Sequence, residues 1–243
     1  MSDGTDFLYP FIDAQETDTG ALLTDLAASA LAKAATSLAL QESSLSLLSE
    51  QIDAAGVDMG ARFAERGRLY TFGNGGSSTD AATLAGLFCD PAYGHALPAW
   101  SLTDDQAVVT ALGNDVGFEL IFSRQIIAHS SSRDIAIAMS ASGNSEDLLR
   151  GLLEAKRRGL LTIGFAGYDG GAMAASGELD YVFTVDSQSI HRIQESQARI
   201  GFRLWQAAQQ EYAARRAARH VLTSASARSI GDQAPSAPSE QEA

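Results

Sequence analysis

The feature that most constrains the fold is an alternation of short apolar segments with helical segments between residues 69 and 220. Short runs rich in β-branched and aromatic residues predict strands at residues 69–72, 99–102, 134–139, 161–165 and 181–185. Helical patterns separate these runs at residues 81–88, 117–128, 146–158 and 171–176, and a final helix is predicted over residues 191–220. Such alternation is typical of a parallel sheet covered by helices on both faces. The sequence therefore predicts an α/β fold, a three-layer αβα sandwich around a five-stranded, mainly parallel sheet.

A leucine-rich helical region precedes this alternation. Residues 20–56 have no Pro or Gly between their two end glycines, and their leucines recur at helical spacing, which predicts one long helix or two shorter ones. Residues 57–66 also have a helical pattern. We expect the leucine stripe to need a partner surface, either on a second subunit or on the same subunit.

The ends of the chain differ in composition from this region. Residues 1–19 show no sustained periodicity and are interpreted as an N-terminal arm. Residues 222–243 are rich in Ser, Ala, Pro and Gln and are interpreted as a disordered tail. Residues 20–221 then form a single domain.

Charge and cysteine content exclude several classes of function. The formal net charge is −13, and residues 1–61 contain ten acidic residues and one lysine, which disfavours non-specific binding to nucleic acid. A single Cys excludes a disulfide framework and a multi-cysteine zinc site. No apolar run is long enough for a membrane span, and the acidic N-terminus does not resemble a signal peptide. We therefore expect a soluble, cytoplasmic protein.

Two loops of Gly, Ser and Asn follow predicted strands and precede predicted helices. They are Gly-Asn-Gly-Gly-Ser-Ser at residues 73–78 and Ser-Ala-Ser-Gly-Asn-Ser at residues 140–145. Backbone N–H groups, hydroxyls and a helix N-terminus together favour an anion, and neither loop contains a lysine. Each loop taken alone is also compatible with an ordinary strand-to-helix turn. Two such loops at the same edge of a sheet predict a crevice that binds a small phosphorylated metabolite through neutral donors.

The chain resembles the sugar isomerase (SIS) domain family, and within it the phosphoheptose isomerase branch, which includes the DnaA initiator-associating protein. The motifs that carry the resemblance are Gly73-Asn74-Gly75-Gly76-Ser77, Gly113-Asn114-Asp115-Val116-Gly117-Phe118-Glu119, Ser142-Gly143-Asn144-Ser145, Gly170-Gly171 and Arg192-Ile193-Gln194-Glu195. The resemblance extends from about residue 22 to about residue 211. It implies a homodimer or homotetramer in which the first and last helices pack between subunits and complete the pockets.

The resemblance also implies a binding site for a phosphorylated sugar, with sedoheptulose 7-phosphate between the two serine loops. The positions that would contact it keep compatible residues: Gly75, Gly76, Ser77, Asn114, Asp115, Ser140, Ala141, Ser142, Ser145 and Gln194. Ala141 replaces the family's usual Thr, so one hydroxyl is missing. The phosphate cradle is otherwise intact.

The positions at which the family binds a metal and transfers protons are substituted in this chain. The resemblance implies a His, a Glu and a second His beside Gln194, and those three positions hold Thr83, Leu87 and Phe202. Leu and Phe side chains carry no ligand atom for zinc, so we expect no metal and no cofactor. His191 and Glu195 are the candidate replacements for the acid and base. The alternatives are a surface His near the start of a helix and a Glu on a solvated helix face.

Three functions remain open. The first is a phosphosugar-binding protein that acts as a sensor or assembly factor with an unidentified protein partner. The second is an isomerase of sedoheptulose 7-phosphate or a related phosphosugar with a non-standard acid–base pair. The third is a structural oligomer with a vestigial cradle. The intact residues Ser77, Ser142 and Gln194 disfavour the third, and the substituted metal positions disfavour the zinc-dependent form of the second. The sequence favours the first.

Overall fold

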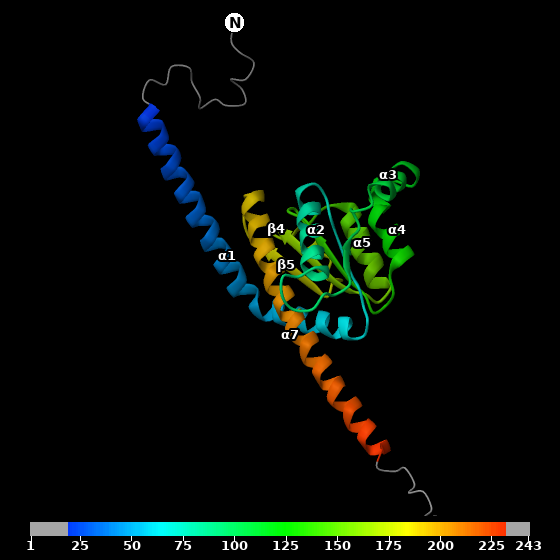
Figure 1. The fold of residues 1–243 in the computed structure, drawn as a ribbon. Helices are drawn as coiled ribbons and strands as arrows, with labels where there is room; N and C mark the ends of the chain where they lie inside the picture. Colours follow the sequence, from blue (N-terminus) through cyan, green and yellow to red (C-terminus); the bar gives the residue numbers. More distant parts are fainter. Residues whose placement is uncertain (1–18, 232–243) are drawn as a thin grey trace, which may run out of the picture.

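A single parallel sheet forms the centre of the protein, which we describe for residues 19–231 in a computed structural model (Figure 1). Its strands are β1 (Leu69–Gly73), β2 (Ala99–Ser101), β3 (Ile135–Met139), β4 (Leu161–Gly167) and β5 (Tyr181–Val185). The order across the sheet is β2-β1-β3-β4-β5, and every neighbouring pair is parallel. All residues of β1, β3 and β4 are buried, as expected for central strands covered on both faces. The predicted five-stranded parallel sheet is confirmed.

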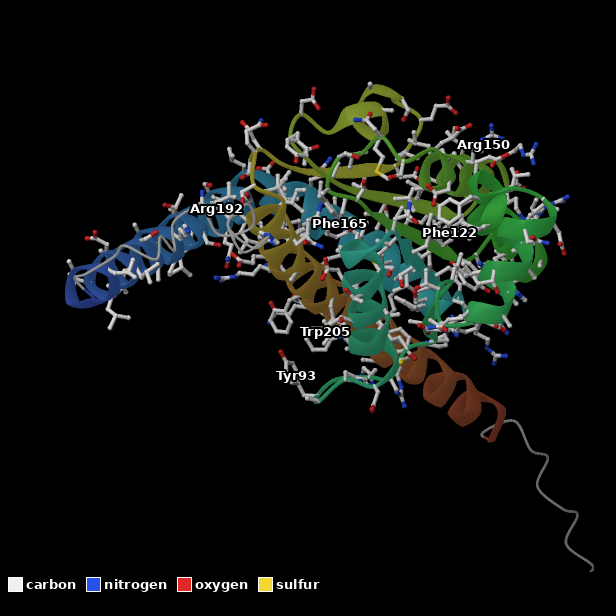
Figure 2. All side chains as sticks on the ribbon, turned by 90° about the horizontal axis from the view of Figure 1, so that it is seen from above. Tyr93, Phe122, Arg150, Phe165, Arg192 and Trp205 are labelled. Atoms are coloured by element: carbon white, nitrogen blue, oxygen red, sulfur yellow. The ribbon has the colours of Figure 1, made fainter. Side chains whose placement is uncertain are left out.

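Helices cover the two faces of the sheet and enclose two separate hydrophobic cores. One face is covered by α1 (Thr19–Ala64), α2 (Gly76–Cys89) and α7 (Ile190–Gly231), and the other by α4 (Ile121–His129), α5 (Glu146–Arg157) and α6 (Gly171–Ala175). Phe165 of β4 belongs to the first core and Phe122 of α4 to the second, and both are labelled in Figure 2. The three-layer arrangement agrees with the prediction.

Helix α1 is one continuous helix of 46 residues rather than two shorter ones. Its C-terminal part packs into the first core through Ile52, Met59 and Phe63, and its main packing partner is α7. Its N-terminal part projects away from the sheet (Figure 1), and Leu31 and Leu47 are 73% and 85% exposed. The stripe is therefore covered only in part by its own chain: Leu45 and Leu48 pack against the first core, whereas Leu23, Leu26 and Leu31 stay exposed. None of the helices within residues 19–231 is long and apolar enough to cross a membrane.

Helix α7 continues to Gly231, beyond the predicted end of the domain at residue 221. The first part of the predicted tail is thus helical, because no Pro or Gly interrupts residues 202–230. The predicted arm and the remainder of the predicted tail lie outside the described residues.

Helix α3 (Gln106–Asp115) is an element that the sequence analysis did not predict. None of its residues is fully buried, and its short apolar face rests on Val109 and Leu112, which pack only partly buried against the second core, so the helical signal in the sequence is weak. The Asp105 carboxylate caps it by accepting a hydrogen bond from the Val108 N–H at 3.1 Å. The helix predicted at residues 117–128 consists of a short 3₁₀ turn, η1 (Phe118–Leu120), followed by α4.

Candidate functional site

A cavity of about 320 Å³ lies where β1 and β3 end and α2 and α5 begin. These two strands are neighbours in the sheet, so the two Gly/Ser/Asn loops that follow them lie side by side. Residues of both loops line the cavity together with residues from the ends of β3 and β4 and the start of α7. The lining is formed by Asn74, Gly76, Ser77, Met139, Ser140, Ala141, Ser142, Ser145, Leu148, Tyr168, Ile190 and Gln194. A crevice at the carboxyl edge of the strands is the usual ligand site of an open α/β sheet.

The first loop presents one serine hydroxyl to this cavity rather than several. Gly75 has a φ of +54°, a backbone conformation that favours glycine, and α2 begins directly after it. The Ser78 hydroxyl donates to the Gly75 carbonyl at 2.7 Å and the Thr79 hydroxyl to the Gly76 carbonyl at 2.6 Å. Ser77, which is buried, is the hydroxyl residue of this loop that lines the cavity.

The second loop is held in shape by its own hydrogen bonds. The Ser140 hydroxyl accepts the Gly143 N–H at 3.0 Å, and the Gly143 backbone has a φ of +68°. A Cβ atom at Gly143 would lie 2.2 Å from the Gly170 carbonyl oxygen, so no larger residue fits without moving backbone. The Ser140 carbonyl accepts from Gln197 Nε2 at 2.8 Å, which ties the loop to α7. The loop is thus fixed before any ligand arrives.

A buried carboxylate fixes the distance between the two loops. Asn74 Nδ2 of the first loop donates to both carboxylate oxygens of Asp147, at 3.0 and 2.8 Å. Asp147 lies in the first turn of α5, and its side chain is buried. Because this contact joins the two loops, their hydroxyls and N–H groups converge on a single volume.

The cavity is lined by neutral groups. Among the described residues that line it, none carries a formal charge. Hydroxyls, side-chain amides and the N-termini of α2 and α5 are donors that suit a phosphate group without a lysine or arginine. The geometry therefore fits the anionic end of a small polar molecule.

A second, smaller pocket of about 70 Å³ continues along the groove between α2 and α7. Met139 lines both spaces. The three positions at which the resemblance implies metal ligands, Thr83, Leu87 and Phe202, meet in this pocket. Among residues 19–231, no three His, Cys, Asp or Glu side chains lie together in a way that could hold a metal ion. The side chains at this end do not fit a metal, because Leu87 and Phe202 offer it no donor atom.

Asp80 is the carboxylate residue that lines the small pocket, and it is hydrogen-bonded to a residue of the large cavity. Its Oδ2 accepts a hydrogen bond from Gln194 Nε2 at 2.9 Å. Gln194 in turn lines the large cavity. Burial raises the pKa of the Asp80 carboxyl, and the hydrogen bond from Gln194 opposes this effect. A carboxyl group of this kind is suited to proton transfer closer to neutral pH than an exposed Asp.

The structure brings most of the predicted ligand-contacting residues together. Those that line the cavity are Gly76, Ser77, Ser140, Ala141, Ser142, Ser145 and Gln194, and Gly75 forms the adjoining turn. Asn114 and Asp115 instead lie at the end of α3, where both are exposed and Asn114 Nδ2 donates to Asp115 Oδ1 at 2.8 Å. They do not line the cavity of their own chain.

The two predicted acid–base residues also lie outside the cavity lining. His191 is exposed in the first turn of α7. Glu195 accepts a hydrogen bond from the hydroxyl of Ser37 on α1. Both residues are exposed on α7, as in the alternatives of a surface His and a Glu on a solvated helix face. A catalytic role for either residue stays a prediction.

Sequence reasoning missed three contributors to the site. Asp80 looks like an ordinary helix residue, and Asp147 looks like a first-turn acid of α5. Tyr168, which lines the cavity after β4, has a left-handed φ of +54° that is uncommon for a non-glycine residue. The signal for this turn in the sequence was weak: Tyr168 directly follows Ala166-Gly167 at the end of an apolar run.

Comparison with known proteins identifies the class to which this fold and site belong. The model of the SIS domain matches residues 33–167, more than half of the chain. The chain therefore belongs to the SIS domain family.

Within this family, the chain is similar to phosphoheptose isomerases. It is 42% identical over 160 residues to the phosphoheptose isomerase of Aquifex aeolicus, covering 64% of this chain and 81% of that protein. It is 37% identical over 156 residues to the enzyme of Aneurinibacillus thermoaerophilus, covering 63% and 76%. The structure of the Francisella tularensis phosphoheptose isomerase superposes with a TM-score of 0.70 at 28% identity, over 75% of this chain and 97% of that one. The chain thus lies in the phosphoheptose isomerase branch.

Proposed function

We propose that the chain binds a phosphorylated sugar in the cavity and interconverts its aldose and ketose forms. The phosphate lies between the loops after β1 and β3, where Ser77, Ser142 and Ser145 supply neutral donors. The sugar extends from there along the groove between α2 and α7. Similarity to phosphoheptose isomerases supports sedoheptulose 7-phosphate or a related phosphosugar as the substrate.

The observation that carries this proposal is the Asp80–Gln194 pair between the cavity and the small pocket. Aldose–ketose isomerisation removes a proton from the carbon next to the carbonyl and returns a proton to the neighbouring carbon. The Asp80 carboxylate accepts this proton and, as the carboxylic acid, delivers it to the neighbouring carbon of the enediol intermediate, while the hydroxyl proton passes between the two substrate oxygens through water. Gln194 positions this carboxyl through the 2.9 Å hydrogen bond. No step passes through a metal, because the side chains of Thr83, Leu87 and Phe202 do not fit one.

An NMR assay tests this function directly. The protein is mixed with sedoheptulose 7-phosphate, with and without a strong chelator, and the appearance of the aldose is followed. We expect slow turnover that the chelator does not change and that falls at least a hundredfold in Asp80→Asn. Asp90→Asn, which removes an exposed carboxylate just after α2, is the matched control. Equal rates for both variants would contradict the role of Asp80.

A second function, binding without turnover, is favoured by the apolar character of the small pocket. In that case the chain is a sensor or assembly factor whose interaction with a protein partner depends on whether the sugar is bound. Stabilisation of the protein by sedoheptulose 7-phosphate in a thermal-shift assay, with no product by NMR, would support this function over the isomerase.

A homo-oligomer, either a dimer or a tetramer, is part of the same proposal. The exposed leucines of α1 require cover, because a lone helix of this kind gains little stability without packing. Asn114 and Asp115 would then reach the cavity of a neighbouring subunit rather than their own. Light scattering should give a mass of at least twice 25.5 kDa for the wild type and a lower mass for Leu31→Glu.

A further inference from the structure

The small pocket continues the large cavity along the facing sides of α2 and α7. On α2 the lining passes from Gly76 and Ser77 to Asp80, Thr83, Leu84 and Leu87, and on α7 from Ile190 and Gln194 to Gln197, Ala198, Gly201 and Phe202. Thr83 lies six residues beyond Ser77, or about 9 Å along the axis of α2. A six- or seven-carbon sugar whose phosphate is held at Ser77 therefore reaches the small pocket with its other end.

The far end of this groove is apolar and structurally supported. Its walls are formed by Leu84, Leu87 and Phe202. Gly201 leaves space in the pocket, since a Cβ at this position would lie 3.2 Å from the Leu84 side chain. The Phe202 ring stacks on Trp205 with a centroid distance of 5.4 Å. Trp205 also meets Tyr93 edge to face, with a centroid distance of 4.9 Å, and the two rings lie together at the edge of the domain in Figure 2. The aromatic wall is therefore fixed in place.

One buried polar group of the small pocket, the side-chain oxygen of Gln197, is an acceptor that lacks a donor within residues 19–231. Gln197 is fully buried and lines the pocket, and its Nε2 donates a hydrogen bond to the Ser140 carbonyl. Its Oε1 has no hydrogen-bond partner among the described residues. Thr83 already donates its hydroxyl proton to the Thr79 carbonyl at 2.8 Å. Buried acceptors without a partner are uncommon, and here the missing donor would come from a ligand.

We propose that this pocket selects phosphosugars that carry a methyl-sized apolar group next to an O–H or N–H donor. The methyl group lies between Leu87 and Phe202, and the adjacent donor makes the hydrogen bond that Gln197 Oε1 lacks. Two kinds of sugar have this chemistry: an amino sugar phosphate with an N-acetyl group and a 6-deoxyhexulose 1-phosphate. The inference rests on the proposed phosphosugar binding but not on turnover.

Matched pairs of ligands test this selectivity by isothermal titration calorimetry. One pair is N-acetylglucosamine 6-phosphate and glucosamine 6-phosphate; the other is a 6-deoxyhexulose 1-phosphate and the same hexulose 1-phosphate with its 6-hydroxyl. We expect the methyl-bearing member of one pair to bind about tenfold more tightly, as is usual for one apolar group in a fitted pocket. The pair that shows the preference identifies which kind of sugar is bound.

A variant that fills the pocket shows whether the preference arises there. Ala198→Leu adds an apolar side chain to the lining at an exposed position of α7, where leucine is a good helix former. The preference for the methyl-bearing sugar should fall to less than twofold, while affinity for its partner is unchanged. Ala214→Leu makes the same substitution at an exposed position of the same helix outside both spaces and should retain the tenfold preference.

The outcomes separate this inference from the proposed function. Binding of both members of each pair with equal affinity would overturn the selectivity and leave phosphosugar binding intact. A preference that survives Ala198→Leu would also overturn it, because the methyl group would then lie elsewhere. Failure of all four sugars and of sedoheptulose 7-phosphate to bind would instead refute the proposed function.

Discussion

The two ends of the groove between α2 and α7 are built in different ways. At the cradle end, the ligand site consists of loops whose backbone must take special conformations, as at Gly75 and Gly143. At the pocket end it consists of side chains on regular helix faces, such as Leu87 and Phe202. A helix keeps its backbone whatever side chain it carries at an accessible position, whereas the cradle loops do not. The cradle therefore couples binding to folding, while the pocket can change its chemistry with little effect on the fold.

The largest expected effect comes from converting the apolar end into a metal site. The triple variant Thr83→His, Leu87→Glu and Phe202→His places two imidazoles and a carboxylate beside Gln194. We expect zinc to bind with a Kd of about 1 μM or tighter, about 8 kcal/mol, and to raise the Tm of the variant. Calorimetry with zinc measures this, with Thr83→His/Phe202→His as the control that lacks the carboxylate. A folded triple variant with no zinc affinity would show that these positions do not converge as described.

At the cradle end, adding one carbon atom to a glycine is expected to lower the stability of the fold substantially, though less than zinc binding would raise that of the triple variant. Gly143→Ala combines a left-handed φ with a Cβ contact of 2.2 Å to the Gly170 carbonyl, and should lower the free energy of unfolding by about 3 kcal/mol. Gly177→Ala is the matched control, since its φ is +62° but no atom lies within 4 Å of its Cβ. Its cost should be roughly 1 kcal/mol, from backbone strain alone. Urea denaturation compares the two, and equal losses would argue against the close packing of the cradle loops.

Removing a single hydroxyl from the cradle should weaken binding while leaving the fold intact. Ser142→Ala removes a cavity-lining hydroxyl, and we expect affinity for sedoheptulose 7-phosphate to fall about tenfold, as for a hydrogen bond to a charged group. Ser78→Ala removes a hydroxyl that donates to the Gly75 carbonyl instead, so its affinity should change less than twofold. Calorimetry distinguishes these results. An unchanged Kd in Ser142→Ala would place the phosphate elsewhere.

The smallest effect concerns the junction of the two ends and depends on pH. Burial raises the folded-state pKa of Asp80, so the folded protein holds this proton more tightly than the unfolded chain. The contribution of the Asp80 carboxyl to the free energy of unfolding is fully present below the ordinary Asp pKa of about 3.9. It is lost as the pH rises through the raised pKa. Asp80→Asn should therefore have a Tm up to about 3 °C above the wild type at pH 7, with the difference shrinking toward pH 4. A difference that grows on acidification would contradict the raised pKa.

Much of the fold could be predicted from the sequence because its signals are local. The buried strands β1, β3 and β4 are short apolar runs, and a parallel sheet requires helices on both faces. The loops after β1 and β3 were identified by their Gly and Ser content before their strands were known to be neighbours. Helix α3 was missed because its apolar face is short and only partly buried, through Val109 and Leu112. The extent of α7 was underestimated because polar composition alone does not end a helix.

The sequence by itself determined the cradle: the glycines that its backbone needs and the serines that line it occur as contiguous motifs. Only the tertiary structure decided what surrounds the cradle. The Asn74–Asp147 contact joins residues 73 positions apart, and Asp80 meets Gln194 across 114 positions. The same packing left His191 and Glu195 out of the cavity lining and brought Thr83, Leu87 and Phe202 into one pocket. Backbone conformation is set by neighbours along the chain, whereas a pocket is set by which helix faces the sheet brings together.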